Sequence, residues 1–176
     1  PANKVFGMAG TLDTGRYRAF LAEAINVSPN DIHAMLLGGH GDTMVPLPRY
    51  TSVNGIPVSQ LLEKEKINSI VERTKKGGGE LVNLMGTSAW YAPGAAAASL
   101  VEAIVDDQKI IVPLCAYLNG SYGLTDVYLG VPVKLGKDGI EEIIEIDLDD
   151  DEKKLLETSA NSVKNVMKAL DDMNIL

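Results

Sequence analysis

The sequence is poor in cysteine, tryptophan, phenylalanine and histidine, and two of these shortages limit its chemistry. Its 176 residues include one Cys, one Trp, two Phe and two His. A lone cysteine forms no internal disulfide, and two histidines with one cysteine show no recognisable metal-ligand spacing. We therefore expect no internal disulfide and no metal site. Cys115 lies in an apolar run, which predicts a buried, inert thiol, and a reducing cytoplasm is consistent with it.

Positive charge and long apolar runs are also scarce. Sixteen Lys and Arg stand against 24 Asp and Glu, a net charge of −8, which argues against a nucleic-acid partner because phosphate binding needs a basic surface. No apolar run approaches the roughly 20 residues that span a bilayer, and residues 1–4 lack the basic-then-apolar pattern of a signal peptide. Because the chain begins with Pro1 and soon enters an apolar segment, we expect a piece of a longer protein.

Hydrophobic periodicity predicts an α+β fold with mostly antiparallel strands. The expected strands cover residues 5–9, 32–37, 47–53, 109–118, 127–135 and 140–146, with a hairpin turn at Asn54-Gly55. The expected helices cover residues 11–25 with Thr11 as N-cap, 63–76, 80–85, 93–105, and a last one opened by the acidic cluster 147–152. The last helix carries one apolar stripe formed by Leu155, Leu156, Ala160, Val163, Val166, Met167 and Leu170.

The glycine run Gly77-Gly78-Gly79 lies inside a helical pattern. It matches neither the G-x-G-x-x-G nor the Walker pattern of phosphate loops. Each glycine costs about 1 kcal/mol in a helix, so we expect a kink or break there.

The two histidines lie in different surroundings. His33 falls within an apolar strand pattern, which favours a packed, structural side chain. His40 is flanked by Gly39 and Gly41, so the backbone can turn sharply and present the imidazole at a strand end. A loop histidine is useful in acid–base chemistry but is not diagnostic of it.

Asp13 and Arg16 are three residues apart at a helix start and so share a face. One interpretation is a local surface ion pair. The other is that Arg16 binds a substrate carboxylate through two parallel hydrogen bonds, while Asp13 fixes the tautomer of His40. Spacing alone leaves both open. A hydrolase that uses His40 and Asp13 with a serine lacks support, because no G-x-S-x-G motif occurs.

Four stretches of the sequence, 7–18, 38–46, 88–97 and 131–136, resemble segments of the lactate/malate dehydrogenase family. The stretch 7–18, GMAGTLDTGRYR, is similar to the family segment that carries the catalytic aspartate and the carboxylate-binding arginine. The stretch 38–46, GGHGDTMVP, resembles its active-site histidine loop, and 88–97, SAWYAPGAAA, resembles its helix beside the nicotinamide. The stretch 131–136, VPVKLG, also matches. The resemblance covers essentially the whole chain.

Two details resemble the malate dehydrogenases of lactate-dehydrogenase-like architecture. Lactate dehydrogenases generally carry Glu in the histidine loop where this chain has Gly39, and the lead-in Gly-Met-Ala-Gly at residues 7–10 is typical of the malate enzymes. The resemblance implies hydride transfer between NAD and malate or oxaloacetate. It implies His40 as general acid/base paired with Asp13, and Arg16 as the anchor of the C1 carboxylate. It also implies a lining near the nicotinamide by Met8, Ala89 and Pro93.

The resemblance also implies a missing partner domain. Family members carry an N-terminal Rossmann domain that supplies the phosphate loop and further arginines. Residues 1–10 would then be a remnant of its last strand, an orphan edge, and residues 11–176 the substrate-binding and catalytic domain. We expect an incomplete NAD site, an isolated chain with little or no activity, and a homodimer or homotetramer in the intact enzyme. Lactate as substrate, and a non-catalytic oligomerisation module, remain alternatives.

Overall fold

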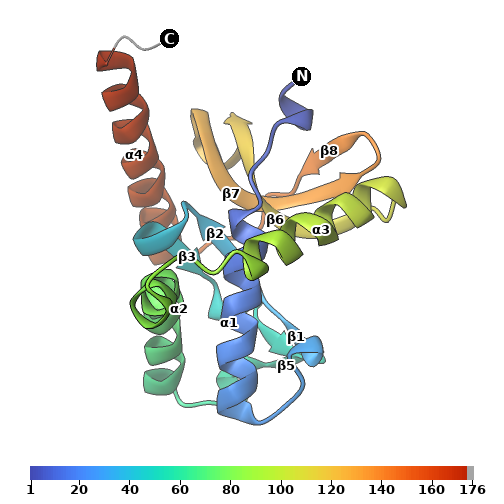
Figure 1. Cartoon of the computed structure of the whole chain (residues 1–176), viewed down its shortest axis with the longest axis vertical. Helices are drawn as coiled ribbons and strands as arrows, with labels where there is room; N and C mark the ends of the chain where they lie inside the picture. Colours follow the sequence, from blue (N-terminus) through green and yellow to red (C-terminus); the bar gives the residue numbers. More distant parts are fainter. Residues whose placement is uncertain (174–176) are drawn as a thin grey trace.

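Two antiparallel sheets and four α-helices make up the computed structural model, which describes residues 1–173 (Figure 1). The helices are α1 (Ala9–Ile25), α2 (Lys64–Met85), α3 (Tyr91–Val105) and α4 (Asp150–Asp172). The five-stranded sheet has the order β3-β2-β7-β6, with β8 also paired to β7. Its strands are β2 (Leu36–Gly38), β3 (Met44–Pro46), β6 (Ile110–Asn119), β7 (Thr125–Gly136) and β8 (Gly139–Ile143). The small sheet is formed by β1 (Ile32–His33), β4 (Ser52–Val53) and β5 (Ile56–Pro57). The predicted α+β fold is confirmed.

The long β6–β7 hairpin is the centre of the main core. The apolar positions of β7 that alternate along the sequence are all fully buried: Val127, Leu129, Val131, Val133 and Leu135. Helix α3 adds Leu100 and Ala103 to this core, and α4 adds Leu156 and Ala160. Each fully buried aliphatic side chain contributes about 1.5–3 kcal/mol relative to an exposed one. This hairpin therefore fixes the frame on which α1 and α4 are placed.

A second core lies between α1, α2 and the small sheet. Tyr17 and Leu21 of α1 are fully buried there, against Ile67 and Ile70 of α2. Helix α1 also contacts β6 and β2 of the large sheet, so it lies between the two cores (Figure 1). Polar side chains on the first half of α1 are consequently enclosed, although nothing in its composition sets them apart from surface residues.

The predicted strand over residues 5–9 is reduced to one bridge. Gly7 exchanges two backbone hydrogen bonds with Cys115 of β6, and Val5 is exposed. Helix α1 then begins at Ala9, with Met8 at the N-cap position, two residues earlier than predicted. Thr11 is not the cap: its hydroxyl donates to the carbonyl oxygen of Pro113 at 3.3 Å. The division at residue 10 and the assignment of residues 1–10 to another domain stay predictions.

Two predicted strands are shorter than their apolar patterns. The run 32–37 is divided between β1 and β2, which belong to different sheets. In the run 47–53 a 3-10 turn, η4 (Pro48–Tyr50), precedes β4, because Pro48 has no N–H for a strand ladder. The Asn54-Gly55 hairpin is confirmed, with φ of 48° and 87°.

His33 is exposed, so its predicted packed role is wrong. Strand β1 is an edge strand of the small sheet, and only its residue Ile32 points into the core. Alternation along the strand turns the next side chain, His33, to the opposite face.

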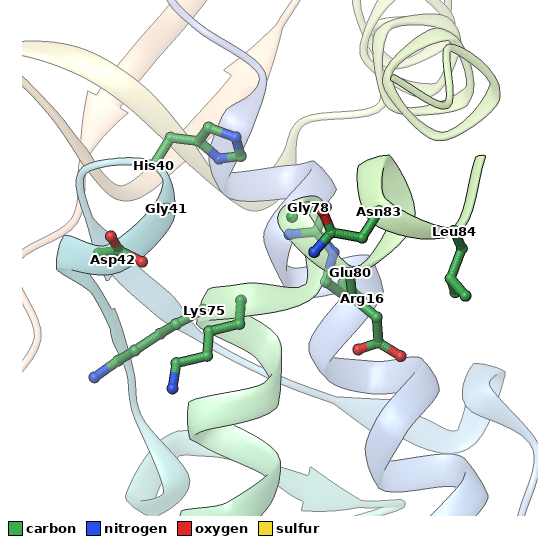
Figure 2. A pocket seen from close by; sticks show the side chains of 11 residues that line it. Arg16, His40, Gly41, Asp42, Lys75, Gly78, Glu80, Asn83 and Leu84 are labelled. Atoms are coloured by element: carbon green, nitrogen blue, oxygen red, sulfur yellow. The ribbon is translucent and has the colours of Figure 1, made fainter. Parts of the chain in front are cut away.

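The glycine run does not break its helix, because α2 continues from Lys64 to Met85. The separate helix predicted over 80–85 is therefore its last turn and a half, and its ribbon changes direction near Gly78 (Figure 2). Helix α4 is confirmed, and Asp149 and Glu152 form a capping box at its start. Its predicted apolar stripe is only partly buried: Leu156 and Ala160 lie in the core, whereas Leu155 is exposed, as are Val166 and Leu170 where α4 extends beyond the sheet (Figure 1). No helix of residues 1–173 has the length and apolarity that crossing a membrane requires.

Candidate active site

Asp13 is a buried carboxylate on α1. Only 1% of its side chain is exposed. Helix α1 runs very close to β6 at this point: a Cβ on Gly10 would lie 2.6 Å from the carbonyl oxygen of Pro113. Because a glycine stands there, the helix backbone can approach the sheet, and Asp13 is carried beneath the loop that follows β2. A buried carboxylate needs partners, since an unpaired charge inside a protein is costly.

His40 supplies the first partner. It follows Gly38 and precedes Gly41, whose φ angles of 86° and 84° lie in the left-handed region that glycine tolerates. His40 itself has an ordinary extended backbone, and its Nδ1 lies 2.8 Å from Asp13 Oδ2. About half of its side chain, 54%, is exposed. The glycine-flanked turn thus presents one ring nitrogen to the protein interior and leaves the rest of the ring accessible.

The carboxylate of Asp13 fixes the tautomer of His40. An ionised carboxylate only accepts hydrogen bonds, so the proton of neutral His40 resides on Nδ1, which donates to Asp13. Nε2 is then the nitrogen with a free lone pair. The hydrogen bond that His40 donates to Asp13 raises the pKa of His40 above its ordinary value of 6.5, partial burial opposes this, and the nearby Arg16 guanidinium also lowers it. The ring is therefore prepared to accept a proton at Nε2.

Arg16 supplies the second partner. Its Nη1 donates to Asp13 Oδ1 at 3.2 Å, so each oxygen of the carboxylate has its own partner. The Arg16 side chain is 14% exposed, and the pair is therefore not the surface ion pair that one interpretation of the sequence described. Arg16 keeps donors that this bond does not use, because a guanidinium has five N–H groups. Both interpretations of the Asp13–Arg16 spacing are thus partly right: the two residues pair, and Asp13 also holds His40.

Gly77 of α2 makes room for Arg16. A Cβ on Gly77 would lie 2.4 Å from Arg16 Cδ and 2.9 Å from its Nε, which no real side chain allows. By contrast, a Cβ on Gly79 would meet nothing within 4 Å. The first glycine of the run is therefore a packing slot for the Arg16 stem. The helix tolerates the run because tertiary contacts with α1 outweigh the propensity cost of glycine.

His40 and Arg16 open onto one cavity of about 1020 Å³ between the loop after β2 and helix α2 (Figure 2). In that view the His40 ring lies above and the Arg16 guanidinium lies beside Gly78 and Asn83. The further lining is formed by Gly41, Asp42, Lys75, Lys76, Gly79, Glu80 and Leu84. No serine contributes to this lining within residues 1–173. The cavity therefore combines a proton acceptor with a guanidinium, as an anionic substrate with an exchangeable proton requires.

The three residues predicted near the nicotinamide do not line the cavity at His40 and Arg16. Met8 is half-buried against the main core, at the N-cap of α1. Ala89, just before α3, and Pro93, in its first turn, are half-buried and do not line the cavity at His40. Their predicted role stays a prediction. No group of three potential metal-ligating residues is found in the described part of the chain.

Sequence reasoning missed several residues of the site. Gly77 was interpreted only as a helix hinge, although a glycine inside a helical pattern also signals close approach of another group. Lys75 and Lys76 line the cavity, and nothing in the sequence singles them out from other lysines. Cys115 was predicted as a buried inert thiol. It is half-buried, burial raises the pKa of its thiol, and it lines a small cavity of about 230 Å³ beside His40 and Asp13.

A family comparison places these residues in context. The model of the lactate/malate dehydrogenase alpha/beta C-terminal domain matches residues 10–173. The chain belongs to the lactate/malate dehydrogenase family. The match includes Asp13, Arg16 and His40, the three residues that the structure brings together.

Individual relatives agree with the family model. A malate dehydrogenase of Cytophaga hutchinsonii is 66% identical over 98% of this chain and 55% of the relative. The solved malate dehydrogenase of Salinibacter ruber has a TM-score of 0.97 at 61% identity, over 99% of this chain and 57% of that structure. A lactate dehydrogenase of Eimeria maxima solved with NADH and oxamate has a TM-score of 0.95 at 44% identity, over 99% and 56%. The chain thus spans about half the length of these proteins.

Proposed function

We propose that the chain is the substrate-binding and proton-transfer portion of an NAD-dependent malate dehydrogenase, which interconverts malate and oxaloacetate. The observation that carries the proposal is the shared carboxylate: Asp13 holds His40 at 2.8 Å through one oxygen and Arg16 at 3.2 Å through the other, beside one open cavity. The high identity to a malate dehydrogenase, 66%, supports this choice of substrate.

Arg16 is the proposed anchor of the C1 carboxylate. A planar guanidinium binds a carboxylate by two parallel N–H···O bonds, and this fixes both the position and the orientation of the acid. Asp13 and Gly77 hold the guanidinium from two sides, so little conformational entropy is lost when the substrate binds. Orientation matters because the C2 hydrogen of malate must point at the hydride acceptor.

His40 is the proposed general acid/base. During malate oxidation, Nε2 removes the proton from the C2 hydroxyl while Nδ1–H stays bonded to Asp13. The resulting imidazolium lies 2.8 Å from a buried carboxylate, which stabilises its charge. In the reverse direction the protonated ring donates to the C2 carbonyl oxygen of oxaloacetate and then supplies the proton of the new hydroxyl group.

The described residues fit only one end of NAD. The cavity at His40 and Arg16 has a volume of about 1020 Å³, but residues 1–173 contain no G-x-G-x-x-G turn for a pyrophosphate. NAD supplies a hydride acceptor when it is bound. Met8, Ala89 and Pro93 are the residues of this chain that we propose near its nicotinamide. The remaining contacts would come from the portion of the relatives that this chain does not match.

The test uses a fusion of this chain with the portion of the Salinibacter ruber malate dehydrogenase that the match leaves uncovered. We expect the fusion to reduce oxaloacetate with NADH, followed by NADH absorbance, and the chain alone to show no appreciable turnover. His40→Gln should abolish most of the activity, whereas His33→Gln should preserve it. A well-folded fusion that does not turn over oxaloacetate would sink the proposal.

Two alternatives are outcomes of the same test. Pyruvate replaces oxaloacetate in a parallel assay, and a preference for pyruvate would support lactate as the substrate, as the name of the Eimeria relative suggests. A folded oligomer without activity on either acid would favour a non-catalytic assembly module. We further propose a cytoplasmic homodimer or homotetramer for the intact protein, which sedimentation of the fusion checks for oligomeric state.

A further inference from the structure

Helix α4 contacts the turn that carries His40, and the contact is polar at its centre. The backbone N–H of Gly39 donates to Ser159 Oγ at 2.7 Å, although the two residues are 120 positions apart. Ser159 is fully buried. The hydroxyl lies directly on the turn, because a Cβ on Gly38 would be 2.7 Å from it. One turn further along α4, Val163 packs on the same backbone: a Cβ on Gly39 would lie 3.5 Å from its Cγ2.

A buried serine in this helix calls for an explanation. Its neighbours Leu156 and Ala160 form the part of the apolar stripe that is buried in the main core. Alanine would be the better helix former at position 159 and would fill the same space with no polar group. A buried hydroxyl is retained at low cost only when it is hydrogen-bonded, and the partner of Ser159 is the amide that immediately precedes His40.

The start of helix α4 is anchored by several contacts, so α4 can hold the turn before His40 in place. Arg49 of η4 donates from Nη2 to Glu152 Oε2 at 2.8 Å and to the carbonyl oxygen of Asp147 at 2.8 Å. Glu152 also completes the capping box with Asp149. The start of α4 is thus tied to the segment that follows β3, while Leu156 anchors its next turn in the core. These contacts therefore fix the position of the Ser159 hydroxyl relative to the five-stranded sheet.

His40, in contrast, has little packing of its own. Its side chain is 54% exposed, and its hydrogen bond to Asp13 is a single contact at the ring. The turn on either side consists of glycines, which impose the fewest conformational limits on a backbone. A ring that depends on one hydrogen bond and a flexible turn needs the turn to be anchored elsewhere.

We propose that Ser159 is a positioning residue for His40: its hydroxyl anchors the Gly38–Gly39 turn from α4, so that the imidazole stays within reach of Asp13. This role rests on the proposed function for its catalytic consequence. The structural consequence, a fixed His40–Asp13 distance, can be measured without any substrate. Ser159 touches neither substrate nor the reacting atoms and acts only through the turn.

The test compares Ser159→Ala with Thr158→Ala. Thr158 is the preceding residue, is exposed, and donates its hydroxyl to Lys154 of its own helix, so its variant also removes one hydroxyl from α4. The readout is the pKa of His40 by NMR titration of the 176-residue chain, with His33→Gln used to assign the two histidine signals. We expect Ser159→Ala to move the pKa of His40 toward 6.5, and Thr158→Ala to leave it at the value of the unsubstituted chain. Amide hydrogen exchange at Gly39 should accelerate only in Ser159→Ala.

Activity of the fusion provides the second readout. Loss of this anchor should lower kcat by about tenfold, while the KM for oxaloacetate changes little because Arg16 is untouched. An unchanged His40 pKa and kcat in folded Ser159→Ala would overturn the positioning role and leave the proposed function standing. An inactive unsubstituted fusion would overturn the function, while the titration still decides the positioning role. If Ser159→Ala fails to fold, Ser159→Cys keeps a similar volume with only a weak acceptor, and its His40 pKa decides in the same way.

Discussion

The chain contains two histidines only seven positions apart, and their surroundings differ in one respect that decides their chemistry. Both are exposed, His33 on the edge strand β1 and His40 on the turn after β2. No acidic side chain pairs with His33 in residues 1–173, whereas His40 lies 2.8 Å from a buried carboxylate. Exposure therefore does not make a histidine functional. What distinguishes His40 is that its Nδ1 is held by a buried carboxylate.

The carboxylate that distinguishes His40 from His33 comes from helix α1. Asp13 is 27 positions away from His40 and lies on α1, which the two cores hold between them. The comparison predicts that perturbing Asp13 or its second partner, Arg16, has larger effects than perturbing anything near His33.

The largest expected effect separates the two histidines directly. In the fusion, His40→Gln should lower kcat by at least about 100-fold, since it removes the proposed general acid/base. His33→Gln should stay within about twofold, as is usual for an exposed side chain without a partner. Steady-state oxaloacetate reduction measures both. Equal losses in the two variants would break the comparison.

The next effect concerns the second partner of Asp13. Arg16→Lys keeps the charge but loses the planar fork, so kcat/KM for oxaloacetate should fall on the order of 100-fold, mostly through KM. The matched control is Arg18→Lys, two residues further along α1 and outside the cavity lining, where the guanidinium donates to the carbonyl oxygen of Pro29. The control should retain most of its activity. A near-normal KM for Arg16→Lys would remove Arg16 from the proposed carboxylate site.

A smaller effect tests the slot for Arg16. Gly77→Ala places a methyl group 2.4 Å from Arg16 Cδ, so the guanidinium must shift and KM should rise about tenfold. In Gly79→Ala the added methyl group meets nothing within 4 Å, so the free energy of unfolding should rise by about 1 kcal/mol and KM should rise less than in Gly77→Ala. Urea unfolding of the chain and kinetics of the fusion supply the two measurements. If both alanines behave alike, the close approach at Gly77 has no functional consequence.

The smallest effect is a pH dependence of stability. The pKa of His40 is raised in the folded chain, mainly by its hydrogen bond with Asp13. Its contribution to stability is therefore fully present below its ordinary pKa of 6.5 and is lost as pH rises through the higher folded value. Because the ring is half exposed, we expect under about 1 kcal/mol. Urea unfolding on both sides of this window should show the loss, and His40→Gln should flatten the profile. A stability that rises with pH there in the unsubstituted chain, but not in the variant, would contradict the assignment.

Much of the fold follows from local pattern. The alternating residues of β7, the hairpin at Asn54-Gly55 and the acidic cluster that opens α4 are each determined within a few neighbouring residues. Their prediction succeeded for that reason. The strand predicted over 5–9 failed because Gly7 makes only one bridge before close packing against β6 allows α1 to begin at Ala9.

The sequence predicted only part of the candidate site. The sequence determined which residue types were available: a histidine between glycines, and a carboxylate and a guanidinium on one helix face. It could not decide whether Asp13 pairs with Arg16, with His40 or with both, and it gave Gly77 and Ser159 no role beyond the helix. Only the tertiary structure made those choices, because burial between two cores and contacts across 27 to 120 positions depend on how whole elements pack.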